Sequence, residues 1–184
     1  MKIFCVPVLV FAACAAQAFA AEIPARLQKW SAEKNIAVGS FVMAKEIPDL
    51  EISVKSAGTF RFEKGAGLTW KNIAPNKFTF FANSLYYEIS APDGSKKSEL
   101  GGFDIKAAAE LLFKGDFSDL REKFEIEVLD DSPEKIRLRL TPKISKIKNA
   151  MESATIVFGA KTLEKCAIVL ANGTILNIEF KETL

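Results

Sequence analysis

The chain of 184 residues contains no histidine. Histidine is the side chain whose ordinary pKa lies closest to neutral pH, and it is the usual base beside a catalytic serine or cysteine. Its absence excludes Ser-His-Asp and Cys-His catalysis, together with zinc sites built on histidine ligands. Carboxylates are left as the remaining candidates for acid–base chemistry.

Cysteine is scarce as well, and the chain has only Cys5, Cys14 and Cys166. The first two lie in the first 20 residues, a segment that we expect to be removed from the mature protein. A single remaining thiol cannot form an internal disulfide, so we expect none. Cys166 lies in an apolar, strand-like run, which is typical of a buried and inert thiol.

The chain also lacks an excess of charge of either sign. Its 25 Lys and Arg residues face 23 Asp and Glu residues, and loss of Lys2 with the first 20 residues would leave 24 against 23. No run of basic side chains is interleaved with aromatic residues, so we expect no nucleic acid partner. We further expect a monomer that uses no cofactor and no metal ion.

No hydrophobic run reaches the roughly 20 residues that a membrane-spanning helix needs, but a shorter one begins the chain. Lys2 is followed by about a dozen apolar residues and then by Ala18-Phe19-Ala20, which is the order of a secretory signal with an Ala-x-Ala cleavage site. We therefore expect residues 1–20 to be a cleavable signal peptide and residues 21–184 to be one domain. The expected location is a bacterial periplasm.

Aromatic residues and short alternating segments are abundant. Three of the 15 phenylalanines lie in the first 20 residues, so 15 − 3 = 12 remain. Phe60 and Phe62 flank Arg61, and such alternation is typical of a strand with one buried face. Ten or eleven strands are expected, separated by turn-forming residues. The predicted segments are residues 40–47, 51–54, 58–63, 67–71, 77–82, 84–90, 124–128, 136–140, 153–158, 163–170 and 174–180.

Three segments favour helix instead. Residues 22–34 place Ile23, Leu27 and Trp30 on one helical face, and Gly39 is expected to end that region. Residues 107–113 are rich in alanine and leucine, and residues 119–123 form a further short turn. Because so large an antiparallel sheet must curl, the predicted fold is α+β. It is a strongly bent antiparallel sheet that forms an unclosed β-barrel, with helices as a lid.

Several short motifs follow one another in a distinctive order. They are Phe41-Val-Met-Ala-Lys45, Ser56-Ala-Gly58-Thr-Phe-Arg-Phe62, Gly67-Leu-Thr-Trp70 and Pro75, and later Leu140-Thr-Pro-Lys143, Asn172-Gly173 and the final strand with Ile178 and Phe180. Their order and spacing resemble the periplasmic lipoprotein carrier family LolA over nearly the whole mature chain. The resemblance implies an unclosed barrel of about eleven strands with lid helices, and a hydrophobic cavity that receives acyl chains.

The resemblance also implies a role. The family shuttles lipoproteins from an inner-membrane transporter to an outer-membrane receptor, so a membrane donor and a membrane acceptor are the expected partners. Two positions depart from the family pattern: Thr69 stands where arginine often ties down the lid, and Met43 stands where glutamine is frequent. We therefore expect a divergent member whose lid is held by packing and whose cargo is another lipid or acyl chain.

The candidate lipid-binding residues are apolar side chains of the expected sheet and lid. An ordinary hydrophobic core would use the same side chains, and the residues alone leave the two interpretations open. The expected cavity wall is Phe41, Phe60, Phe62, Trp70, Phe78 and Phe80, and the expected inner face of the lid is Leu111, Leu112 and Phe113.

Two alternatives to a free carrier remain open. Phe11-Ala-Ala-Cys14 is similar to a lipobox, so acylation at Cys14 would give a membrane-anchored receptor like LolB. A non-transport interaction module of the same fold is the other. Catalysis is not expected, because the adjacent acids Asp130 and Asp131 precede a Ser-Pro turn and Glu125 and Glu127 fall on an outward strand face.

Overall fold

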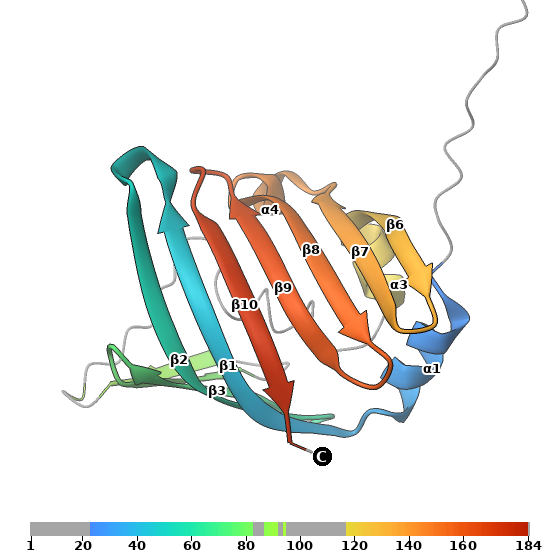
Figure 1. Cartoon of the computed structure of the whole chain (residues 1–184), viewed down its shortest axis with the longest axis horizontal. Helices are drawn as coiled ribbons and strands as arrows, with labels where there is room; N and C mark the ends of the chain where they lie inside the picture. Colours follow the sequence, from blue (N-terminus) through green and yellow to red (C-terminus); the bar gives the residue numbers. More distant parts are fainter. Residues whose placement is uncertain (1–22, 83–86, 92–93, 95–116, 184) are drawn as a thin grey trace, which may run out of the picture.

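The computed structural model describes residues 23–82, 87–91, 94 and 117–183. These residues form one antiparallel sheet in the strand order β5-β4-β3-β2-β1-β10-β9-β8-β7-β6 (Figure 1). The strands are β1 (Ile36–Ile47), β2 (Ile52–Glu63), β3 (Gly67–Ala74), β4 (Phe78–Ala82), β5 (Tyr87–Ser90), β6 (Phe124–Ser132), β7 (Lys135–Pro142), β8 (Met151–Gly159), β9 (Leu163–Leu170) and β10 (Ile175–Glu182).

The sheet is strongly bent and does not close. Its two edge strands, β5 and β6, stand at opposite ends of the strand order. In Figure 1 the strands β3, β4 and β5 turn behind the long strands β1 and β2, so that the sheet curls around its rear side. The fold class expected from the sequence, α+β with a strongly bent antiparallel sheet that forms an unclosed β-barrel, is therefore confirmed.

Register divides the side chains between two faces. Phe60 lies opposite Trp70, and Trp70 lies opposite Phe80, so these three share one face. We call this the inner face; β6 to β10 continue it with side chains that pair in the same way. The buried residues that these pairings place on it include Phe124, Ile126, Ile136, Leu138, Leu140, Ala154, Ile156, Phe158, Cys166, Ile168, Ile178 and Phe180.

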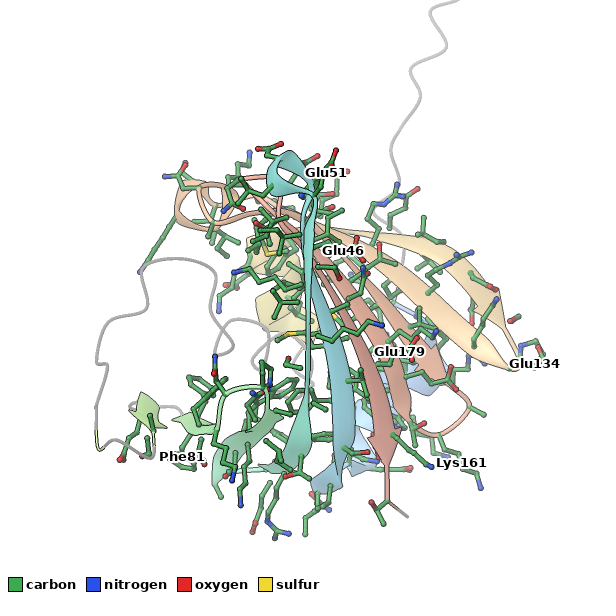
Figure 2. The ribbon with its side chains drawn as sticks, turned by 60° about the vertical axis from the view of Figure 1, so that its left-hand side comes forward. Glu46, Glu51, Phe81, Glu134, Lys161 and Glu179 are labelled. Atoms are coloured by element: carbon green, nitrogen blue, oxygen red, sulfur yellow. The ribbon has the colours of Figure 1, made fainter. Side chains whose placement is uncertain are left out.

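The outer face is polar over the centre of the sheet. Glu46 of β1 and Glu179 of β10 project from it in Figure 2, and both lie opposite other outer-face positions in the register. Lys165 Nζ lies 2.7 Å from the Glu179 carboxylate. Burial of one face and solvation of the other is the usual condition of an antiparallel sheet.

Two helices contribute to the core on the inner side. Helix α1 (Ala25–Glu33) supplies Leu27, the preceding Ile23 is also buried, and α3 (Phe117–Lys123) supplies Leu120. The helices predicted near residues 22–34 and 119–123 are thus confirmed, whereas the one predicted at residues 107–113 lies outside the described residues. Two short elements complete the described part, the 3-10 helix η1 (Pro48–Leu50) and α4 (Ser145–Lys148).

Some predicted boundaries were wrong. Residues 51–54 and 58–63 belong to one continuous strand, β2, and β1 begins at Ile36 and runs through Gly39. Both errors have the same cause: β1 and β2 pair residue by residue from Ile36↔Glu63 to Ile47↔Ile52. This ladder keeps residues of low strand preference in extended conformation.

Gly58 is where the ladder between β2 and β3 shifts its register. A Cβ atom at this position would meet the Lys71 carbonyl oxygen and the ring of Phe41. The glycine therefore lets the Phe41 ring lie flat over β2, which places it on Trp70.

Candidate functional site

An aromatic cluster occupies the inner face between β1, β2, β3 and β10. Phe41 stacks on Trp70 with ring centroids 3.7 Å apart. Phe180 meets Trp70 edge to face at 6.1 Å and Phe60 edge to face at 5.5 Å. Such pairs add to the free energy of burying aromatic area, so the cluster is a rigid apolar platform.

The predicted wall residues fall into two groups. Five of them are buried, with Phe80 fully buried, and Phe78 is partly buried against the core. The predicted lid residues Leu111, Leu112 and Phe113 lie outside the described residues. The structure thus brings the six aromatics onto one face, and their contact with a ligand stays a prediction. The five buried residues are Phe41, Phe60, Phe62, Trp70 and Phe80.

The inner face continues beyond the aromatic cluster toward the hairpin between β1 and β2. Val54 is 43% exposed and Ile52 is 47% exposed, although register places both on the face that carries Phe41 and Phe60. Leu50, at the hairpin itself, is 63% exposed. We call Leu50, Ile52 and Val54 the apolar rim. From Gly58 to Ile52, where β2 begins, the strand spans roughly 20 Å.

Three polar side chains lie where the aromatic cluster meets the rim. Ser56 is on β2, two residues from Gly58, and Asn72 lies directly opposite Gly58 on β3. Trp70 is two residues from Asn72, so all three belong to the inner face. The Ser56 hydroxyl oxygen, Trp70 Nε1 and Asn72 Oδ1 are buried and make no hydrogen bond in the described part of the protein.

Sequence reasoning missed Ser56 and Asn72. Both residues fall outside the predicted strands 51–54, 58–63 and 67–71, so the sequence assigned neither of them to a face. Their signal is positional: counting by two from Trp70 leads to Asn72, and counting back by two from Gly58 leads to Ser56.

The carboxylates that invited a catalytic interpretation are engaged with cations or solvent. Glu125 is exposed. The other three form ion pairs: Glu127 with Arg139 at 3.4 Å, Asp130 with Lys135 at 3.2 Å and Asp131 with Arg26 at 2.7 Å. Asp130 and Asp131 lie in β6 rather than in the predicted turn, because the ladder with β7 continues to Ser132 and Lys135.

Ion pairing also sets the titration of Asp130. Desolvation acts to raise the pKa of this carboxyl, but the hydrogen bond and charge of Lys135, helped by Ser132 and Arg137, hold it below its usual value. A lowered pKa keeps the carboxylate charged at neutral pH, which suits a structural pair rather than a general acid. Within the described residues, no group of three or more Cys, Asp or Glu side chains could hold a metal ion.

The two positions that depart from the family pattern lie on different faces. Thr69 is half-buried on the outer face, opposite Arg61 in the register, whereas Met43 is on the inner face and packs partly buried against the core. Met43 lies opposite Ser56 and therefore borders the three polar side chains. Cys166 is buried on the inner face as expected.

Among the described residues, no helix is long and apolar enough to span a membrane. No protein-family model matches the sequence, and no curated protein matches it.

Solved structures are similar to the chain. One is a LolA superfamily protein from Nitrosomonas europaea, with 8% identity, a TM-score of 0.44 and coverage of 85% of this chain and 90% of that one. Another is a DUF1329 family protein from Desulfovibrio piger, with 9% identity, a TM-score of 0.45 and coverage of 84% and 87%. A third is in the MucA/MucB complex of Pseudomonas aeruginosa, with 12% identity, a TM-score of 0.45 and coverage of 84% and 53%.

Proposed function

We propose that the protein is a periplasmic carrier that binds an acyl chain of a lipoprotein or another lipid against the inner face of its sheet. It would receive this cargo from an inner-membrane donor and pass it to an outer-membrane acceptor. The observation that carries the proposal is that the buried aromatic cluster and the exposed apolar rim lie on the same face of the sheet. One ligand chain could lie along this face while part of it remains reachable from solvent.

Energetics support a carrier on this surface. Moving an acyl chain from water to an apolar surface gains about 0.8 kcal/mol of free energy for each CH₂ group that is buried. Ile52 and Val54 expose apolar area of their own, so covering them with the same chain removes two apolar surfaces from water at once. The predicted wall and lid keep their roles in this proposal: the buried aromatics form the floor, and Phe78 and the rim make the more accessible contacts.

A pair of valines gives the proposal a matched test. Val54 faces inward at 43% exposure, and Val42 of the neighbouring strand faces outward at 54% exposure. Val54→Asp places a charge in the lipid path, whereas Val42→Asp places the same charge on the solvated face. Because both side chains are exposed, each variant should stay folded, with a free energy of unfolding within about 1 kcal/mol of the wild type.

Native mass spectrometry of protein purified gently from cells gives the readout. We expect lipid adducts on the wild type and on Val42→Asp, and a loss of most adducts from Val54→Asp. A wild type without lipid, or a Val54→Asp variant that carries as much as Val42→Asp, would contradict the proposal. The same spectrum distinguishes a free carrier that begins at Ala21 from a receptor acylated at Cys14.

A further inference from the structure

The three polar side chains between the aromatic cluster and the rim form an unusual group for an apolar surface. Asn72 is 2% exposed and Trp70 is 3% exposed. A buried donor or acceptor without a partner destabilises the fold, and native proteins rarely retain one. Three such atoms at adjacent inner-face positions therefore point to a partner outside the described residues.

The orientation of the Asn72 side chain is fixed by its own contacts. Its Nδ2 donates to the backbone carbonyl of Ala74 at 3.1 Å and to that of Asn76. Because only the NH₂ end of an amide can donate, these two carbonyls define which end is nitrogen. Asn72 Oδ1 is consequently an acceptor directed away from its own turn.

The Trp70 indole has equally restricted chemistry. Indole nitrogen can only donate, and a serine hydroxyl can both donate and accept. The group therefore offers one fixed donor at Trp70, one fixed acceptor at Asn72 and one adaptable hydroxyl at Ser56. In contrast, the other tryptophan is already satisfied, because Trp30 Nε1 donates to the Lys161 carbonyl at 2.7 Å.

We propose that Ser56, Trp70 and Asn72 bind the polar end of an acyl ligand that both accepts and donates hydrogen bonds, as a fatty amide does. This inference rests on the proposed function and specifies its substrate class. The ligand carbonyl accepts from Trp70, its N–H donates to Asn72 Oδ1, and Ser56 completes the set. The acyl chain then follows the inner face to the rim.

Other lipid head groups match the hydrogen-bonding groups of Ser56, Trp70 and Asn72 less well. An ester has a carbonyl but no donor, so Asn72 Oδ1 would stay unpaired. A carboxylate has no donor either, so it would also leave Asn72 Oδ1 unpaired and would place a second acceptor beside it. The site therefore selects acyl amides over esters and fatty acid anions.

Three ligands of equal chain length separate head-group recognition from apolar binding. Decanamide can accept and donate, N,N-dimethyldecanamide can only accept, and decane can do neither. Binding to the purified protein, as the cell processes it, is measured by calorimetry. We expect decanamide to bind about tenfold more tightly than the dimethyl amide, because the latter leaves a buried acceptor unpaired, and decane to bind most weakly.

The two tryptophans provide an internal control that needs no variant. NMR resolves one indole N–H signal for each of Trp30 and Trp70, the two tryptophans of the chain. Decanamide should move the Trp70 signal downfield, as a new hydrogen bond does, and should leave the Trp30 signal in place. Trp70→Phe should lower the affinity for both amides by about tenfold relative to the affinity for decane. Trp30→Phe should leave the affinities for all three ligands unchanged.

The outcomes are distinct. Equal affinity for the three ligands with an unmoved Trp70 signal would overturn the inference, while lipid carriage would stand. If none of the ligands binds, the proposed function fails, and the head-group site fails with it.

Discussion

At the scale of single residues, burial changes what a side chain can do. Lys34 pairs with Glu182, whose side chain is only 3% exposed, and Glu182 also accepts from the backbone N–H of Leu163. These contacts tie the segment after α1 to the end of β10 and the start of β9. Removing either partner would leave the other group unpaired in a buried position, which is strongly destabilising.

Cys166 illustrates the same principle with a measurable result. Burial raises the pKa of its thiol to about 12. The thiolate is the reactive form, so the folded protein should resist iodoacetamide. We expect alkylation near pH 8 to be at least about a thousandfold slower than in denaturant, because access requires an opening that costs about 5 kcal/mol or more. Mass spectrometry of the alkylated chain measures the rate.

The thiol also affects stability at alkaline pH. As pH rises from the ordinary value of 9.0 toward about 12, the unfolded chain loses the thiol proton while the folded chain keeps it. Proton release then favours the unfolded state, so the advantage of the wild type over Cys166→Ala should shrink in this window. Rapid alkylation of the native protein, or a constant difference between the two proteins, would contradict the burial.

At the scale of elements, the sequence predicted the inner face better than the ends of strands. Alternation around Phe60 and Trp70 is sufficient because side chains of a strand change face at every residue. The segment Lys55–Ala57 carries no such pattern, and its extended form depends on the ladder with β1, which a single sequence does not reveal. The same limit concealed Ser56, whose direction follows from register.

Arg26 is one of the residues that attach helix α1 to the sheet. Arg26 donates to the Asp131 carboxylate from Nε at 3.1 Å and from a terminal nitrogen at 2.7 Å. It also donates to the carbonyls of Pro133 at 3.0 Å and Lys135 at 2.8 Å. Two backbone acceptors and a carboxylate position α1 against the hairpin between β6 and β7.

Replacing this arginine tests the attachment. Arg26→Met keeps an apolar stem but removes four hydrogen bonds, and it should lower the free energy of unfolding by about 1–2 kcal/mol, since the exposed pair itself contributes little. Lys29→Met on the same helix is the control. Lys29 makes only an exposed pair with Glu33 at 3.9 Å. The free energy of unfolding of Lys29→Met should therefore stay within about 0.5 kcal/mol of the wild-type value. Urea denaturation compares the variants, and equal stabilities would refute the role of Arg26.

At the scale of the whole molecule, the last strand joins the two parts of the sheet. β10 lies between β1 and β9, so in the hydrogen-bonded ladder of the described residues it alone joins β1 to β5 with β6 to β9. Figure 1 shows this strand in the middle of the sheet. The first and last described strands are thus neighbours, which makes the fold depend on contacts that are distant in sequence.

Phe180 is the side chain through which this junction can be weakened. It is 8% exposed and packs edge to face on Phe60 and Trp70. Phe180→Ala should cost about 3 kcal/mol, whereas Lys181→Ala, on the outer face of the same strand, should stay within about 0.5 kcal/mol. Equilibrium unfolding in urea gives both values, and a similar cost for the two substitutions would contradict the role of Phe180.

The two tryptophans reveal whether the sheet unfolds as one unit. Trp70 lies in β3, and Trp30 contacts Phe158 of β8 edge to face at 5.3 Å, so each reports one side of β10. Because β10 belongs to both ladders, Phe180→Ala should shift the transitions of both reporters equally. Fluorescence of Trp30→Phe and Trp70→Phe backgrounds reads them separately. Coincident midpoints indicate one cooperative sheet, and a shift confined to the Trp70 reporter would mean that the two parts unfold independently.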